Sequence, residues 1–164
     1  MAKEEIIGEM KEVFGNDIRR VDHALKVLGY AEDIMAGEDV SEDMHNIITD
    51  AAVLHDIGIK EAERKYGSSA GPYQEKEGPP IAKAIMEKLK RPPGVIDRVC
   101  YIVGHHHTAS RVDGLDFQIL WEADLLVNIK GEGLDRDRKS LKSIVEKNFK
   151  TSTGKAIACS LFSL

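Results

Sequence analysis

Apolar residues recur at helical spacing along almost the whole chain, and this periodicity is the feature that most constrains its fold. One such stripe lies in residues 17–35 and consists of Ile18, Val21, Leu25, Leu28 and Ala31. A spacing of three or four residues is typical of one face of an α-helix. The alternating pattern of a β-strand is absent before residue 150, and residues 151–164 fit either a helix or a strand. We therefore expect an all-α fold, a single compact helical bundle.

Glycine, proline and helix-capping residues divide this pattern into segments. We expect helices over residues 2–14, 17–35, 41–56, 79–89, 93–105, 117–130 and 135–149, with one or two helical turns at 60–66. The pair Pro79-Pro80 either starts its helix or kinks one that begins near Gln74. Residues 67–72 are expected to form a loop that could act as a flap over a site. Residues 1–164 are expected to form one domain, with a core of about 17–130 and a helical extension over 131–164.

Composition and charge exclude several classes of protein. The net charge is −5, which argues against an extended nucleic-acid surface, since such surfaces need clustered basic residues. No apolar run approaches the ~20 residues that span a bilayer, and the N-terminus lacks the apolar region of a signal peptide. We therefore expect a cytoplasmic protein with no membrane partner. Cys100 and Cys159 are too few for a disulfide framework and are expected to be buried free thiols.

The dipeptide His55-Asp56 is the first candidate for metal chemistry. It lies at a predicted helix end beside Gly58, where a turn of the backbone lets both side chains reach one ion. An imidazole and a carboxylate together suit a divalent first-row metal. His23 lies on the preceding helix and can approach His55 from across the core. His45 lies ten residues before His55 on the same helix, ~15 Å along the axis, so we expect it at the surface.

Two further groups of residues could join this pair. Asp124 lies in the most apolar stretch of the chain, ILWEADLLVNI, where a carboxylate is costly unless it is paired or bound to a metal. It would bind either a metal or a hydrogen-bond partner, such as Asn128 or a histidine. The triplet of residues 105–107 consists of three histidines at a predicted helix end, where side chains can fan out toward different ions. We expect His107 to face solvent.

Taken together, His23, His55-Asp56 and Asp124 resemble the H…HD…D signature of the HD-domain superfamily of metal-dependent phosphohydrolases. The resemblance covers about residues 17–130. It implies one or two divalent metal ions, which could be Fe, Mn, Ni, Co or Zn, with Mg possible. It also implies that metal-activated water cleaves a small phosphoester, such as a nucleotide or a related phosphorylated metabolite.

The chain is also similar to the two-metal members of the superfamily, which include the HD-GYP cyclic di-GMP phosphodiesterases. Those members carry a further histidine after the HD motif and a His-His pair before the last aspartate. His105 and His106 resemble that pair, and Glu77 stands in place of the further histidine. The resemblance therefore implies that Glu77, His105 and His106 hold a second ion, or bind phosphate if there is one ion, and that Asp56 bridges the ions. Residues 107–117 lack the GYP motif, so cyclic di-GMP is not the expected substrate.

Three basic residues lie in or near the loops that border the predicted site. Lys60, Lys76 and Arg111 could bind a substrate phosphate, or they could be ordinary surface charges. Two other functions stay open at this point. Some HD-type proteins with a similar ligand set are di-iron oxygenases, and others are non-catalytic metal- or nucleotide-binding regulatory modules. The sequence does not predict the oligomeric state.

Overall fold

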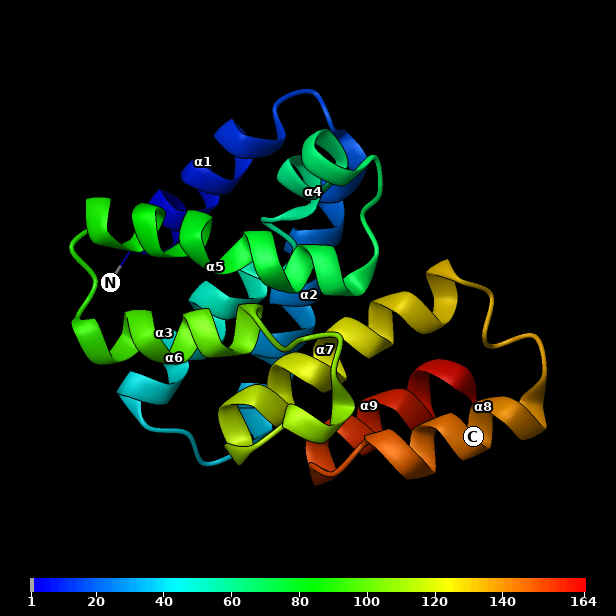
Figure 1. The fold of residues 1–164 in the computed structure, drawn as a ribbon. Coiled ribbons are helices and arrows are strands. Elements are labelled where there is room, and N and C mark those ends of the chain that lie inside the picture. Colours follow the sequence, from blue (N-terminus) through cyan, green and yellow to red (C-terminus); the bar gives the residue numbers. More distant parts are fainter. Residues whose placement is uncertain (1) are drawn as a thin grey trace.

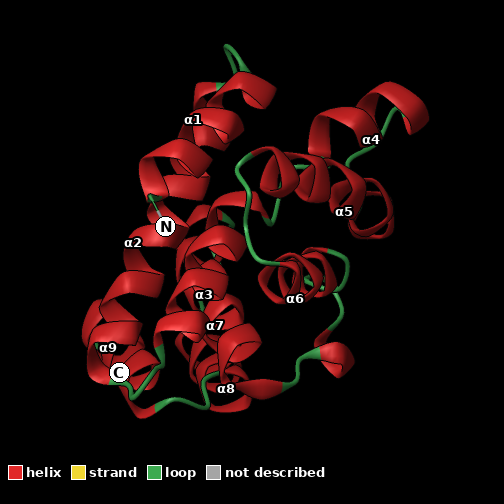
Figure 2. Cartoon of the chain, turned by 90° about the vertical axis from the view of Figure 1, so that its left-hand side faces the viewer, coloured by secondary structure: helices red, strands yellow, loops and turns green. Residues whose placement is uncertain are grey.

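A computed structural model describes residues 2–164, and within this range the chain forms helices and no strand (Figures 1 and 2). The all-α prediction is thus confirmed. The elements in chain order are α1 (Lys3–Phe14), α2 (Ile18–Gly37), α3 (Glu42–Leu54), α4 (Ile59–Tyr66), α5 (Gly71–Lys88), α6 (Pro93–Val103), the short 3₁₀ helix η1 (Ala109–Arg111), α7 (Gly114–Gly131), α8 (Arg138–Asn148) and α9 (Ser152–Phe162).

Three helices, α2, α3 and α7, pack against one another at the centre of the molecule. Helix α6 packs against α3, α5 lies along α6, and α4 lies on α5 (Figure 2). The C-terminal helices α8 and α9 lie at the end of the molecule opposite α1 and α4, and α9 contacts both α7 and α2 (Figure 1). Residues from distant parts of the sequence therefore meet where α2, α3 and α7 come together.

Apolar faces and capped ends explain why these segments form helices. The three central helices bury Ile34, Leu54 and Leu120 with no exposed surface, and each side chain of this size contributes ~1.5–3 kcal/mol when buried. The Ser41 hydroxyl accepts a hydrogen bond from the Met44 amide at 3.2 Å at the start of α3. Such a cap satisfies an amide that the first turn of a helix leaves free.

Several helix ends differ from those predicted. Helix α5 begins at Gly71 and runs through Pro79-Pro80, so the loop before it shortens to residues 67–70. Helix α7 begins at Gly114, before the predicted start at residue 117, and Asp116 in its first turn accepts hydrogen bonds from Arg98. Helix α8 begins at Arg138, since the Asp137 side chain accepts from the Lys139 amide.

Two further predictions concern the C-terminal segment and the cysteines. Residues 152–162 are helical, which decides between the two alternatives for residues 151–164. Cys100 and Cys159 are both free thiols, as expected, but they are half-buried, not fully buried. Among residues 2–164, no helix is both long enough and apolar enough to cross a bilayer.

Candidate metal centre

The turn between α3 and α4 carries His55 and Asp56, and α5 crosses directly over it. Gly58 follows in this turn with a φ of −81°, so no unusual backbone angle requires a glycine there. A Cβ atom on Gly58 would instead lie 2.6 Å from the Gly78 amide nitrogen and 2.8 Å from the Gln74 carbonyl oxygen. Gly58 was predicted to stop the helix. Its lack of a side chain serves to let α5 approach the turn.

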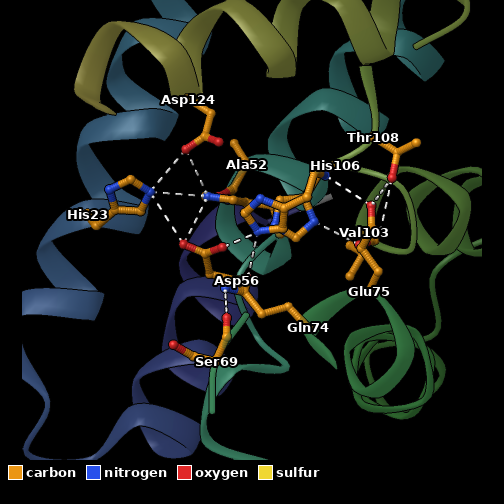
Figure 3. A network of polar contacts seen from close by, with 12 residues as sticks. His23, Ala52, Asp56, Ser69, Gln74, Glu75, Val103, His106, Thr108 and Asp124 are labelled. Atoms are coloured by element: carbon orange, nitrogen blue, oxygen red, sulfur yellow. Dashed lines mark hydrogen bonds and ion pairs between the residues drawn. The ribbon is translucent and has the colours of Figure 1, made fainter. Parts of the chain in front are cut away.

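Four side chains that the sequence singled out meet beside this turn, and Figure 3 labels three of them, His23, Asp56 and Asp124. The Nε2 atom of His23, on α2, lies 3.3 Å from Nε2 of His55 and 3.1 Å from Oδ1 of Asp124, on α7. Nε2 of His55 lies 3.4 Å from the same Asp124 oxygen. Oδ2 of Asp56 lies 3.4 Å from the His23 nitrogen and 3.3 Å from the His55 nitrogen. The predicted convergence of these residues across packed helices is therefore observed.

Hydrogen bonding fixes which nitrogen of His55 faces this cluster. Nδ1 of His55 lies 2.8 Å from the Ala52 carbonyl oxygen, to which it donates. In the neutral ring, Nε2 then carries a lone pair and faces two carboxylates, which also only accept hydrogen bonds. Burial lowers the pKa of His55, but the charges of Asp56 and Asp124 outweigh burial and hold that pKa well above its usual value.

The pKa values of the two carboxyl groups shift in the direction opposite to that of His55. Burial raises the pKa of Asp56 and of Asp124, but the nearby histidines, His55 first, outweigh it and leave both pKa values below their usual range. The cluster therefore favours a positive charge at its centre, which a proton or a metal ion can supply. Two imidazoles and two carboxylates form a donor set that fits a divalent first-row transition metal.

A second group of ligand atoms begins at the other oxygen of Asp56. Oδ1 of Asp56 lies 3.2 Å from Nε2 of His106, and Nδ1 of His106 is held by the Val103 carbonyl oxygen at 2.8 Å. His107 completes this group, because ligand atoms of Asp56, His106 and His107 lie within 4.8 Å of one another. Asp56 thus directs one oxygen toward each group, which is the arrangement of a bridging carboxylate (Figure 3).

The three histidines after α6 are directed differently from the prediction. His107 was expected to face solvent. As a residue it is exposed, but its Nε2 lies 3.0 Å from Oε1 of Gln74 and its ring belongs to the second group. Burial, and then the nearby His106, lower the pKa of His107, so its ring is neutral near pH 7. His105 was expected to be a ligand, but it is directed away, with Nδ1 2.7 Å from the Tyr101 carbonyl oxygen and its ring against that of Tyr101.

Glu77 was also expected to be a ligand, and the structure places it elsewhere. Its two carboxylate oxygens accept from Lys65 Nζ at 2.7 Å and from the Tyr66 hydroxyl at 2.8 Å, which ties α5 to α4. These hydrogen bonds, that of Lys65 first, lower the pKa of Glu77. The α5 residue at the second group is Gln74. Helical spacing could have indicated it, since Gln74 lies four residues before Gly78, on the face of α5 that meets the Asp56 turn.

A hollow of about 520 Å³ opens over the first group, and its lining includes His23, Asp56 and Asp124. Three basic residues of α2 also line it: Arg19, Arg20 and Lys26. Residues 67–70, part of the predicted flap, border it through Ser69. That this loop acts as a flap stays a prediction.

The basic residues expected to bind phosphate do not line this hollow. Lys76 lies over the ring of Tyr66, 5.8 Å from its centroid. Arg111 belongs to η1, where its carbonyl oxygen accepts from the Tyr101 hydroxyl. Lys60 is exposed on α4, and it is its neighbour Ile59 that reaches the hollow. The cations beside the centre come from α2 instead, because α2 supplies the helix face that carries His23.

The fold and this pair of histidine–aspartate groups define an all-helical protein with a candidate metal centre at the junction of three helices. The HD domain family model matches residues 20–148, and the chain therefore belongs to the HD-domain family. The match includes α8, which lies in what was expected to be an extension beyond the core. Family membership and the histidine–aspartate groups support a metal-dependent hydrolase.

The chain also resembles a solved structure, the crystal structure of a predicted HD superfamily hydrolase from an uncultured Thermotogales bacterium. The two share 24% sequence identity with a TM-score of 0.72, over 98% of this chain and 84% of the other. At this level of identity the similarity supports the fold alone. No curated protein matches the chain in sequence.

Proposed function

We propose that this protein is a metal-dependent phosphohydrolase that cleaves a small phosphoester, a nucleotide or a related phosphorylated metabolite. The observation that carries the proposal is the position of the Asp56 carboxylate. One of its oxygens faces His23 and His55, and the other faces His106. A carboxylate between two histidine groups is suited to hold two cations side by side, which is the arrangement used to bind the oxygens of a phosphoryl group.

The proposed ligands of the first ion are His23, His55, Asp56 and Asp124, and those of the second are Asp56, His106 and His107. A bound Fe, Mn, Ni, Co, Zn or Mg ion would lower the pKa of a water molecule and neutralise charge on the phosphoryl group. The carbonyl groups that accept from Nδ1 of His55 and His106 keep Nε2 of both rings free to act as a ligand.

Basic residues of α2 are suited to bind the remaining negative charge of the substrate. Arg19 and His23 are four residues apart and therefore share a helix face. Within residues 2–164, ion pairs engage Arg20 with Asp17 and Glu63, and no ion pair engages Arg19. Arg19 is thus the cation best placed to contact a phosphate, which explains how a chain with a net charge of −5 can accept an anionic substrate.

Metal reconstitution combined with a substrate panel tests this function. The purified protein is stripped with a chelator, each divalent metal is added back in turn, and release of phosphate or alcohol from phosphomonoesters and phosphodiesters is measured. We expect hydrolysis that requires metal. Bound metal without hydrolysis of any ester would overturn the proposal. Iron-dependent oxygen consumption would support the oxygenase alternative, and a protein that binds no metal would support a regulatory module.

Two neighbouring histidines provide a matched test of the second group. His107→Ala removes a proposed ligand and should weaken binding of the second ion by about 10- to 100-fold or more, because loss even of a residue that supports a ligand has an effect of this size. His105→Ala removes a ring that lies against Tyr101 and should leave metal content unchanged. Metal content by elemental analysis decides between them. A larger loss of metal from His105→Ala than from His107→Ala would show that His105 is a ligand.

A further inference from the structure

Two large apolar side chains of α7, Trp121 and Leu125, are only partly buried although they pack against the core. Phe117, Leu120 and Ala123 are fully buried in the core, whereas Trp121 and Leu125 are half-buried. Trp121 and Leu125 also contact the core, but each keeps part of its apolar surface exposed. Large apolar side chains that stay partly exposed beside a polar centre are characteristic of ligand-binding surfaces.

These two side chains form part of the wall of a second, smaller hollow of about 150 Å³, which is lined by His106, His107, Trp121, Asp124, Leu125 and Asn128. Trp121, Leu125 and Asn128 follow at i, i+4 and i+7, so they lie along one side of α7. Asp124, His107 and Asn128 line both hollows, which places the smaller one directly beside the larger one. A ligand that reaches the metal centre can therefore extend into both.

The indole of Trp121 is held in place by the neighbouring helix. Its Nε1 donates to Oδ1 of Asn148 at 3.3 Å, and the Asn148 amide nitrogen in turn donates to the Ile144 carbonyl oxygen at 2.8 Å. The only polar group of the indole is thus engaged with α8, which leaves an apolar ring to line the hollow. Asn128 makes no side-chain hydrogen bond within residues 2–164, so its amide is free both to donate and to accept.

We propose that the smaller hollow binds the base of a nucleotide, with the base against Trp121 and its polar edge at Asn128. The proposal rests on the proposed function and narrows its substrate class to nucleotides. A planar heterocycle suits this combination, because aromatic rings stack on bases of any identity and an amide can pair with the donors and acceptors of a base edge. The phosphoryl group would then lie at the metal ions that Asp56 and Asp124 would hold, and the larger hollow would receive the rest of the substrate.

Tryptophan fluorescence tests the base site without any hydrolysis, since Trp121 is the single tryptophan of the 164 residues. Metal-free protein is titrated with adenosine, which carries a base and no phosphate, and separately with ribose 5-phosphate, which carries a phosphate and no base. We expect saturable quenching by adenosine and none by ribose 5-phosphate. An unchanged emission spectrum with adenosine would overturn the base site and would leave the proposed phosphohydrolase activity untouched.

Kinetics of the metal-loaded protein provide the second readout. Trp121→Leu should lower kcat/KM for adenosine monophosphate by about 10- to 100-fold, the range that loss of a base–aromatic contact produces, mainly through KM. It should leave kcat/KM for ribose 5-phosphate unchanged, and Trp121→Phe should restore most of the loss. Asn148→Ala is the control, because it removes the indole hydrogen bond and keeps the ring. An equal loss for both substrates in Trp121→Leu would show that Trp121 only supports the fold.

Discussion

Glu122 and Asp124 lie two residues apart on α7, and both carboxylates sit in the same apolar stretch, but their surroundings differ. Glu122 is fully buried, and the protein itself supplies all of its donors. Oε2 accepts from Gln118 Nε2 at 2.6 Å, from the Lys150 amide at 2.8 Å and from the Thr151 amide at 3.0 Å, and Oε1 accepts from the Thr151 hydroxyl at 2.6 Å. These hydrogen bonds connect the start of α9 to α7.

Asp124 has no such set of committed donors. Its Oδ1 atom faces the Nε2 atoms of His23 and His55, and the proton of the neutral His55 ring is already used at the Ala52 carbonyl oxygen. Nε2 of His23 can donate to Oδ1 of Asp124 in one tautomer, but the neutral His55 ring cannot, so the cluster favours a further proton or another cation. The comparison indicates that a carboxylate in an apolar stretch is a candidate metal ligand when its neighbours are imidazole nitrogens, and a structural contact when its neighbours are amides and hydroxyls.

Asp56→Asn should produce the largest effect, because Asp56 belongs to both histidine groups. The substitution keeps the shape of the side chain but removes a negative charge and directs an amide toward ring nitrogens. We expect metal-dependent hydrolysis to fall by more than ~100-fold, beyond the loss caused by changes to residues that only support ligands. Elemental analysis and kcat/KM on the same preparation measure this. Full metal content in this variant would contradict the assignment of Asp56 as a ligand.

Glu122→Ala should affect stability and leave the metal centre intact. The change leaves the buried amide and hydroxyl of Thr151 without an acceptor, and we expect it to lower the free energy of unfolding by about 2–4 kcal/mol. Chemical denaturation measures the loss, with Glu146→Ala on the exposed face of α8 as a control expected within about 0.5 kcal/mol of the unchanged protein. Loss of metal from folded Glu122→Ala protein would remove the distinction between the two carboxylates.

The helices and the four central residues could be predicted because both depend on spacing along the chain. The apolar period identifies the helices, and residues far apart in sequence, such as His23 and Asp124, come together once those helices pack. The same spacing failed where a side-chain direction depends on how a helix ends. After α6 the backbone leaves the helix at Gly104, so the sequence could not show that His107, and not His105, would be directed toward Asp56.

The assignment of Glu77 failed for a different physical reason. On α5, Glu77 and Gln74 are three residues apart, and the sequence places a charged residue beside Gly78, where a ligand was expected. Lys65 and Tyr66 on α4 compete for that carboxylate and take both of its oxygens. Such competition between a metal and neighbouring donors depends on the packing of α4 on α5, which no local pattern of the sequence reveals.

Gly58→Ala should disturb the turn at the metal centre by a moderate amount. The added Cβ would meet backbone atoms of α5, which cannot move as a side chain can, and we expect a loss of about 1–3 kcal/mol in the free energy of unfolding. The displacement of α5 should also weaken the contact between Gln74 and His107. Gly29→Ala, within α2 and with no atom near the added Cβ, is the matched control and should stabilise the protein by about 0.5–1 kcal/mol. Equal effects of the two substitutions would show that close packing is not the reason for Gly58.

Glu77→Gln should have the smallest effect and is the sharpest test of the corrected ligand set. The amide oxygen can still accept from the Tyr66 hydroxyl, whereas the attraction to Lys65, whose side chain is 44% exposed, is lost. Ion pairs with an exposed partner contribute little to stability, so the thermal midpoint should fall by no more than about 2–4 °C. Metal content and turnover should not change, because both oxygens of Glu77 face α4. A clear fall in metal content would instead place Glu77 at the second ion, as the family resemblance implied. In that case the face of α5 directed toward Asp56 would have to be a different one from the face that carries Gln74.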